Sequence, residues 1–393
     1  CFTPADLNMW QFRSPEIVYG EDSLSRLADL DARRIVIITD PVMVDLEFVQ
    51  TIKDRLEQVS ELRIFADVEP EPSIKTAQRA RAMVDEVEPD LVIALGGGSV
   101  LDVAKVAWFL HEHPSVTLEE ISIFDSYRPA SSRLVAIPTT SGSGAEVTVA
   151  AVLTDHDSER KLTIYAYELQ PTLIIADPIL TQKMPRQLVA HSGIDAISHA
   201  IESFTGAWHN DYCDGLSVHA LRLAFHYLPL AWADGADHQA RERMHNAATI
   251  AGLAMTNSAI GLGHALAHSL GAMLRIPHGK AIGLMLPYSM AFTANGGGTR
   301  YAELAHLLGY KAEDEAEGLE ALLGVLNGLF ETLSQPTMIR QLGLSPAEFE
   351  EILPDLVSGA AQDHQLLTTV RVPDENELAR LYRYAYDGRD VDF

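Results

Sequence analysis

The sequence predicts an α/β domain built on a parallel sheet, followed by an all-helical domain. Up to about residue 185, short apolar runs alternate with amphipathic stretches, whereas beyond that point the strand signal fades and helical periodicity continues. Near-continuous apolar strands separated by helices are typical of a parallel sheet that is covered on both faces. A chain of 393 residues is also long enough for two cores. We therefore expect one domain at 1–185 and a second at 186–393.

Strands and helices alternate in the first predicted domain. Apolar runs predict buried strands at 34–39, 62–65, 91–95, 134–137 and 173–176. Helices are expected at 45–59 and 73–87, the second with Ser73 as its N-cap. Residues 147–166 are typical of a hairpin that turns at 155–158.

Helices alone are expected in the second domain. Apolar residues recur with helical period at 187–204, 214–229, 238–255, 259–274 and 279–294. The sequence contains no repeat or long linker, so the two halves are predicted to pack closely together. A cleft between two such domains is the usual place for a ligand.

Charge and cysteine content exclude several classes of protein. A formal charge of −26 argues against nucleic acid or an anionic membrane as a partner, because both bind basic surfaces. Since Cys1 and Cys213 are the only cysteines, neither a disulfide framework nor a thiolate metal site is expected. The sequence has no recognisable export leader and no run of roughly 20 apolar residues, which favours a cytoplasmic protein.

One aspartate and several histidines have the spacing of a metal site. Asp195 and His199 are four residues apart, which places both side chains on one face of a helix. His264 and His268 repeat this spacing on a later helix, and His278 lies in a turn between proline and glycine. A carboxylate with three imidazoles is a typical set of ligands for a divalent transition metal. The alternative is a solvated helix face.

The type of ligand favours Fe(II) without excluding other metals. Catalytic zinc usually takes three protein ligands and keeps one position open. A metal that accepts five or six ligands keeps room for an alcohol oxygen beside four protein ligands, so Fe(II) is preferred, while Zn, Mn, Co and Ni stay possible. The remaining histidines, His191 and His245 among them, lack such a context and are expected to be structural or exposed.

Two loops in the first domain have the character of a nucleotide site. The glycines and serine at 96–99 follow a buried strand and open a helix, whose N-terminus offers unpaired N–H groups to a phosphate. The Ser/Gly-rich loop at 138–144 also follows a strand and could hold pyrophosphate or ribose; the alternative is a plain turn. Asp40 ends the first strong strand, where a carboxylate binds an adenosine ribose and repels a 2′-phosphate. NAD is therefore favoured over NADP, unless Asp40 only caps the chain before Pro41.

Five motifs in order resemble those of the iron-containing (group III) alcohol dehydrogenases, a family that includes lactaldehyde reductase and 1,3-propanediol dehydrogenase. The motifs lie at 96–105, 138–144, 193–202, 264–268 and 277–280. The resemblance implies a Rossmann-like N-terminal domain and a helical domain that carries the metal, with NAD(P) between them, as in the dehydroquinate synthase-like and iron alcohol dehydrogenase fold. It also implies hydride transfer between NAD(H) and a small primary alcohol or diol, in dimers or assemblies of dimers.

Site residues follow from this resemblance motif by motif. The metal ligands would be Asp195, His199, His264 and His278. Gly97, Gly98, Ser99 and Asp102 would bind the pyrophosphate and nicotinamide region. Thr139, Thr140 and Ser143 would contact the phosphates and nicotinamide ribose, and Asp40 the adenosine ribose. Weaker assignments to the cofactor are Val152, Lys161 and Leu180. His268 would line the substrate pocket as a proton relay, or else only orient its neighbours.

One departure from the family leaves the substrate open. Members often carry an Asn-Pro-Arg segment near the C-terminus, which the stretch at 363–372 lacks, and Ala150, Ala151 and Met255 predict an apolar, open pocket. The alternatives are a zinc-dependent glycerol dehydrogenase-like enzyme, a dehydroquinate synthase-like lyase on the same scaffold, and a binding protein without turnover. The apolar pocket disfavours the lyase, which needs basic residues for an acidic, phosphorylated substrate.

Overall fold

A six-stranded parallel sheet forms the first half of the protein in a computed structural model, which describes residues 11–56, 59–155 and 160–393. The order of strands in the sheet is β1-β8-β5-β4-β2-β3, and β6 and β7 form a separate antiparallel hairpin. The strands are β1 Glu16–Tyr19, β2 Arg34–Thr39, β3 Glu61–Phe65, β4 Leu91–Gly96, β5 Arg133–Pro138, β6 Ala150–Asp155, β7 Arg160–Tyr165 and β8 Leu173–Ala176.

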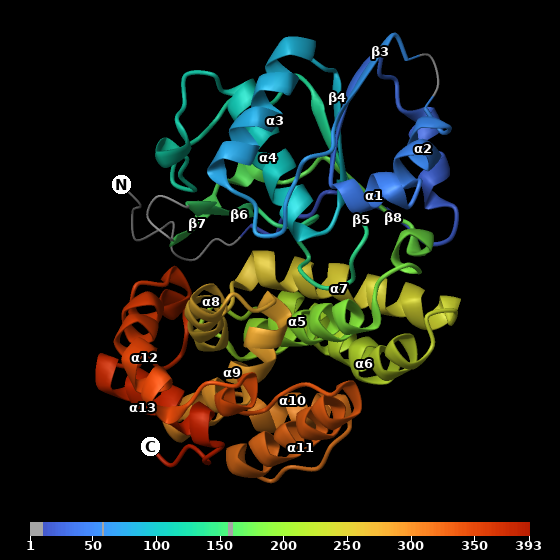
Figure 1. The fold of residues 1–393 in the computed structure, drawn as a ribbon. Coiled ribbons are helices and arrows are strands. Elements are labelled where there is room, and N and C mark those ends of the chain that lie inside the picture. Colours follow the sequence, from blue (N-terminus) through green and yellow to red (C-terminus); the bar gives the residue numbers. More distant parts are fainter. Residues whose placement is uncertain (1–10, 57–58, 156–159) are drawn as a thin grey trace.

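Thirteen α-helices are assigned among the described residues, and nine of them follow the last strand (Figure 1). Those in the first half are α1 Pro41–Asp45, α2 Phe48–Lys53, α3 Ile74–Val87 and α4 Gly98–Glu112. Those in the second half are α5 Arg186–Thr205, α6 Asp211–Ala233, α7 His238–Ser258, α8 Leu262–Leu274, α9 His278–Asn295, α10 Tyr301–Leu308, α11 Glu315–Leu333, α12 Pro346–Ala361 and α13 Glu375–Asp387. Short 3-10 helices include η2 Ser23–Asp29, η3 Leu118–Glu120, η4 Tyr167–Leu169, η5 Pro178–Thr181, η6 Ile339–Leu342 and η7 His364–Thr368.

The apolar strands bury both faces, as the sequence predicts for a covered parallel sheet. In β2, Val36 and Ile38 pack into the core shared with α3 and α4, while Ile35 and Ile37 pack against α2 and η2 on the opposite face. Ser73 caps α3 as predicted, since its side chain accepts a hydrogen bond from the N–H of Thr76. The predicted class, an α/β sheet followed by helices, is therefore confirmed.

Two local predictions in the first half are wrong. In place of one helix at 45–59, α1 ends at Asp45 and α2 covers Phe48–Lys53, because Glu47 between them adopts a left-handed conformation with φ of 60°; residues 57–58 lie outside the described part. The edge strand β1 went unpredicted, since its four residues acquire strand character by pairing with β8. The predicted strands at 147–166 are present as β6 and β7, but residues 156–159 of their turn lie outside the described part.

The second half is a bundle centred on α5, which packs against α6, α7 and α9. In Figure 1 this bundle lies below the sheet half, with α7 and α5 facing it. The change from strands to helices occurs at Arg186, where α5 begins, while the division into domains at 185 stays a prediction. Within the described residues, no single helix has the length and hydropathy of a membrane span, and only α7 and α8 taken together, bent by 109°, reach them.

Candidate metal and nucleotide sites

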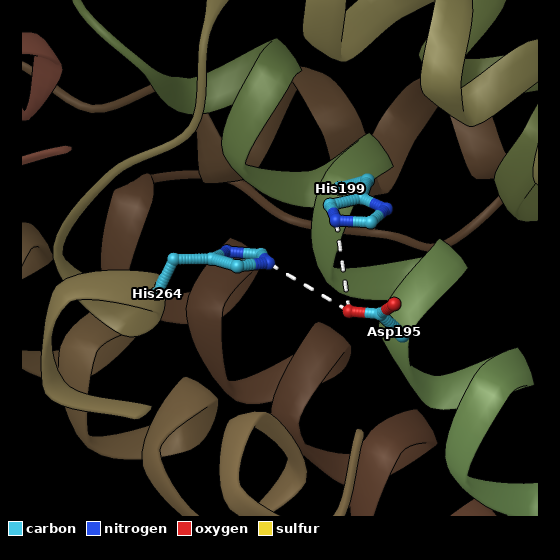
Figure 2. A group of neighbouring side chains, drawn as sticks. All are labelled: Asp195, His199 and His264. Atoms are coloured by element: carbon cyan, nitrogen blue, oxygen red, sulfur yellow. Dashed lines mark ion pairs between the residues drawn. The ribbon is translucent and has the colours of Figure 1, made fainter. Parts of the chain in front are cut away.

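Three helices bring the four predicted metal ligands together. Asp195 and His199 lie on one face of α5, His264 comes from α8, and His278 is the first residue of α9. Asp195 Oδ1 lies 3.6 Å from His199 Nε2, 3.7 Å from His264 Nε2 and 3.2 Å from His278 Nε2. Figure 2 shows the first three of these side chains pointing toward one another. Residues 83 positions apart in sequence thus share one small volume.

The chemistry of this cluster fits a divalent cation. Asp195, His199 and His264 are buried, and one third of the His278 side chain is exposed. Asp195 Oδ1 and His264 Nε2 have no hydrogen-bond partner among the described residues, although both atoms are buried. Buried polar atoms of this kind are costly unless something satisfies them. A cation bound by the converging oxygen and nitrogen atoms would do so, and the open side of His278 would give it access.

Charges within the cluster set the protonation of the candidate ligands. Burial raises the pKa of Asp195, but the imidazoles of His199 and His278 outweigh it and hold the pKa well below its usual value. Burial lowers the pKa of His199 to about 4, which keeps this ring neutral and able to bind a metal at pH 7. In His264, burial alone would lower the pKa, but the Glu202 carboxylate raises it to about 9. A cation would therefore replace a proton on His264.

Glu202 is a site residue to which the sequence reasoning assigned no role. It lies on α5 one turn after His199, and its Oε2 accepts a hydrogen bond from His264 Nδ1, while Oε1 accepts one from the N–H of Gly263 at 2.7 Å. A carboxylate on the far nitrogen of a ligating histidine orients the ring and makes it a better ligand. The signal was present in the sequence, because Asp195, His199 and Glu202 recur with helical spacing.

His268 lies beside the cluster and contacts a carboxylate outside it. Its ring centroid is 5.8 Å from that of His264 and 5.2 Å from that of His278. Its Nδ1 lies 2.7 Å from Asp363 Oδ2, a contact that the sequence reasoning missed. Burial lowers the pKa of His268 in spite of this carboxylate, so the ring is neutral at pH 7.

Three neighbouring strands end at the predicted nucleotide loops. Because β2, β4 and β5 are parallel neighbours, Asp40, Gly97 and Thr139, which follow them, lie along one edge of the sheet. Ligands of open α/β sheets bind outside this carboxyl edge. Gly97 precedes α4, so the N-terminal N–H groups of that helix are available to an anion.

The glycine loop and the Ser/Gly loop face each other closely. A Cβ atom on Gly97 would lie 3.1 Å from Thr140 Cγ2, and one on Gly98 would lie 2.9 Å from Ser143 Oγ. Side chains larger than hydrogen would therefore close the space between these two loops. Ser99, which is also predicted to bind the cofactor, lies in the first turn of α4.

Asp40 and Asp102 already have partners in the protein. The Asp40 carboxylate caps α1 by accepting a hydrogen bond from the N–H of Met43 at 3.0 Å, which is the capping alternative raised from the sequence. Its role at a ribose stays a prediction. Asp102 Oδ2 accepts a hydrogen bond from the N–H of Val152 at 3.0 Å, which joins two predicted cofactor residues. Burial raises the pKa of Asp102 to about 6, although Lys105 lies near it.

Lys161 and Leu180 are the two remaining residues that are predicted to contact the cofactor. Lys161 forms an ion pair with Glu71 at 3.2 Å, and Leu180 is buried in η5, between β8 and α5. The Lys161–Glu71 ion pair does not involve the glycine loop, and the roles of Lys161 and Leu180 at the cofactor stay predictions.

The Ser/Gly loop packs onto α5, which carries two of the predicted metal ligands, and onto α7. A Cβ atom on Gly142 would lie 2.5 Å from the Cβ of Ser192, which precedes Asp195 by one turn of α5. The same loop contacts α7, where His245 Nδ1 lies 3.1 Å from Ser141 Oγ. Burial lowers the pKa of His245 to about 4, and of the two positions expected from the sequence, structural or exposed, this buried ring takes the structural one. The predicted nucleotide and metal sites therefore adjoin.

Comparison with known proteins agrees with this geometry. The model of the iron-containing alcohol dehydrogenase family matches residues 14–178, and the model of the C-terminal part of the Fe-containing alcohol dehydrogenase family matches 189–386. Aldehyde-alcohol dehydrogenase 2 of Entamoeba histolytica is 34% identical over 96% of this chain and 47% of its own length. The chain spans about half the length of the first curated relatives it matches.

Two further relatives match along their whole length. The NADPH-dependent butanol dehydrogenase of Clostridium saccharobutylicum is 31% identical over 98% of this chain and 100% of its own. The solved structure of an iron-containing alcohol dehydrogenase from Thermococcus thioreducens has a TM-score of 0.87 and 31% identity, over 97% of this chain and 100% of its own. These relatives favour the predicted alcohol dehydrogenase over the lyase and glycerol dehydrogenase-like alternatives. The resemblance predicted from the motifs is confirmed, and the chain belongs to the iron-containing alcohol dehydrogenase family.

Proposed function

We propose that the protein is a metal-dependent alcohol dehydrogenase that interconverts a small primary alcohol or diol and its aldehyde with a nicotinamide dinucleotide. One observation carries the proposal: a single carboxylate oxygen, Asp195 Oδ1, lies 3.2–3.7 Å from the Nε2 atoms of three histidines, beside the glycine and Ser/Gly loops. Family membership supports the same activity.

The proposed metal is Fe(II), held by Asp195, His199, His264 and His278. Four nitrogen and oxygen donors without a thiolate suit a metal that accepts further ligands, although zinc stays an alternative. Bound there, such a metal would act as a Lewis acid toward the oxygen of the substrate. The protein itself would hold the ligands in place, with Glu202 orienting His264 and the three helices keeping the donors together.

The residues of the sheet half would place the dinucleotide against this centre. N–H groups at the start of α4 would bind the pyrophosphate, and the close approach of Gly97 and Gly98 to Thr140 and Ser143 would leave only a narrow space for it. Asp102 would lie on the nicotinamide side, where it is tied to β6 through the N–H of Val152. Correct placement of the reacting carbon atoms is the main contribution expected from these groups.

NAD rather than NADP is the proposed cofactor, because a 2′-phosphate would be repelled by the Asp40 carboxylate. Asp40→Ser should keep the cap of α1, since serine also accepts at an N-cap, while it removes the charge. We expect kcat/KM for NADPH to rise about 10-fold or more relative to NADH. Asp45→Ser, which removes an exposed charge from the same helix, is the control. Comparable kcat/KM for NADH and NADPH in the unmodified protein would remove the preference.

His268 is the proposed proton relay, because it lies beside the ligands without belonging to the set around Asp195. His268→Ala should retain the metal and lower kcat about 100-fold, with a changed pH profile. Metal content and the pH dependence of kcat in the same preparations check this prediction. Full activity with an unchanged pH profile would leave His268 with an orienting role.

Dimeric assembly and a cytoplasmic location remain proposals. Light scattering coupled to size-exclusion chromatography would measure the first, and a monomer at micromolar concentration would contradict it.

An NADH-oxidation screen tests the proposed function. Protein purified anaerobically is analysed for metal and assayed with aldehydes and hydroxyaldehydes of two to eight carbons. We expect one NADH oxidised for each alcohol formed, with the rate lost on chelation and restored by Fe(II). A lyase of the dehydroquinate synthase type would consume no net NADH, and that result with metal-loaded protein would refute the proposal.

A further inference from the structure

Both carboxylate oxygens of Asp363 are engaged, and each leads to a different part of the molecule. Oδ2 lies 2.7 Å from His268 Nδ1, and Oδ1 accepts a hydrogen bond from the backbone N–H of Gln365 at 2.8 Å. A carboxylate can only accept hydrogen bonds, so His268 Nδ1 must be the donor. This contact defines the tautomer of His268 and leaves its Nε2 as the nitrogen free to act on a substrate.

The side chain of Gln365 continues the chain of hydrogen bonds into the sheet half. Its Nε2 donates to the hydroxyl of Tyr165 at 2.7 Å, across 200 positions of sequence. Gln365 is buried, and burial raises the pKa of Tyr165 to about 12, so the hydroxyl is neutral at physiological pH. This part-buried hydrogen bond joins η7 of the helical half to β7 of the hairpin.

The hairpin end of this contact is itself anchored to the predicted nucleotide site. Tyr165 pairs with Ala150 across the hairpin, and the Ala150 carbonyl accepts a hydrogen bond from Lys105 Nζ at 2.9 Å. Two residues further along β6, the N–H of Val152 donates to Asp102. The hairpin therefore contacts α4, whose N-terminus lies at the glycine loop, and also contacts η7 through the hydrogen bond of Gln365 to Tyr165.

At its other end, this chain of hydrogen bonds is fixed within the helical half. Thr368 is the last residue of η7. Its hydroxyl donates to the carbonyl of Ile260, and its backbone carbonyl accepts a hydrogen bond from the N–H of Ala207 at 2.9 Å. Since η7 is held on this side, a displacement of the hairpin would be transmitted through Gln365 to Asp363.

We propose that Tyr165, Gln365 and Asp363 are positioning residues that couple the orientation of His268 to the contact between the nucleotide-binding half and the metal-binding half. The proposal rests on the proposed function, because it concerns the histidine assigned there to the substrate. Asp363 holds the His268 ring in the tautomer whose Nε2 is free. Tyr165 holds the side chain of Gln365, so that the backbone N–H of Gln365 keeps its hydrogen bond to Asp363.

A double-mutant cycle tests the coupling, because Tyr165 and Asp363 are joined through Gln365 alone in this chain of contacts. We expect Tyr165→Phe to lower kcat about 3- to 10-fold and Asp363→Asn about 10- to 100-fold, with KM for the aldehyde changed less than about twofold and metal content unchanged. The double variant should be no slower than Asp363→Asn, since both changes act on one unit. Tyr165→Phe that leaves kcat unchanged, or effects that multiply in the double variant, would overturn the proposal.

Tyr288→Phe is the matched control, because this tyrosine hydroxyl is also part of one half-buried hydrogen bond, which it donates to the Thr337 carbonyl at 2.9 Å within the helical half. Alone, Tyr288→Phe should leave kcat at the value of the unmodified protein. Combined with Asp363→Asn, it should leave kcat at the value of the Asp363→Asn variant. If Asp363→Asn fails to fold, Gln365→Met replaces it in the cycle, since this variant removes the side-chain amide and keeps the backbone N–H.

Ring 15N NMR of the zinc-loaded protein separates this proposal from the proposed function. The His268 signal is assigned by its loss in His268→Gln. We expect the Nδ1-protonated tautomer in the unmodified protein and a shift to the Nε2-protonated form in Asp363→Asn. An Nε2-protonated ring in the unmodified protein would overturn the positioning role even if the enzyme turns over, whereas absent turnover with the expected tautomer would count only against the proposed function.

Discussion

His264→Ala should remove bound metal and turnover together. His264 is 1% exposed, its Nε2 faces Asp195, and its Nδ1 donates to Glu202, so both ring nitrogens are committed to the cluster. We expect metal content to fall from about one ion per chain to near zero and kcat to fall at least about 100-fold. Parallel metal analysis and steady-state kinetics on anaerobically prepared protein measure both quantities.

The same substitution should also destabilise the protein. Glu202 would remain as a buried carboxylate without its imidazole partner, a change that costs about 3–5 kcal/mol in other buried ion pairs, while Asp195 would keep His199 and His278 beside it. His226→Ala on α6 is the control, because this exposed imidazole lies outside the cluster and its loss should change neither metal content nor stability. A His264→Ala protein that keeps its metal and most of its activity would contradict the assigned ligand set.

Gly279→Ala should weaken the metal site without touching a ligand. A Cβ atom on Gly279 would lie 2.0 Å from the carbonyl oxygen of His191, so the start of α9 would have to move away from α5. His278 is the preceding residue and would move with it, away from Asp195. Overpacking of this kind costs about 1–3 kcal/mol, which corresponds to a dissociation constant for the metal raised about 5- to 150-fold. Competition with a chromophoric chelator measures that constant.

Gly324→Ala serves as the control for this prediction. Gly324 lies in α11, and a Cβ atom there would have no neighbour within 4 Å. Alanine is the better helix former, so this variant should be more stable by up to about 1 kcal/mol, with unchanged metal affinity. If Gly279→Ala binds metal as tightly as Gly324→Ala, the packing of α9 on α5 does not place His278.

Local patterns in the sequence account for the parts of the fold that were predicted. The strand at 34–39 was recognisable because its residues are apolar on both faces, and Ser73 because an N-cap is a local contact. The break between α1 and α2 left no comparable signal, since Glu47 takes a left-handed conformation that glycine usually marks. Strand β1 depends on β8, more than 150 positions later, so its pairing could not be read from its own four residues.

The same contrast holds at the candidate site. Asp195 and His199 form a pair by helical spacing alone. Their convergence with His264 and His278 depends on how α5, α8 and α9 pack, so the residue types and the resemblance to a family predicted it, and spacing did not. Asp363 and Gln365 went unnoticed because their partners are 95 and 200 positions away. Contacts of such long range follow from the fold and leave no spacing in the sequence.

Anomalous diffraction at the iron edge, from crystals grown anaerobically with Fe(II) and NAD⁺, tests the central claim most directly. One strong peak is expected within about 2.0–2.3 Å of Asp195, His199, His264 and His278, with the nicotinamide ring beside it and the pyrophosphate at the start of α4. A peak elsewhere, or a dinucleotide bound away from these four side chains, would contradict it.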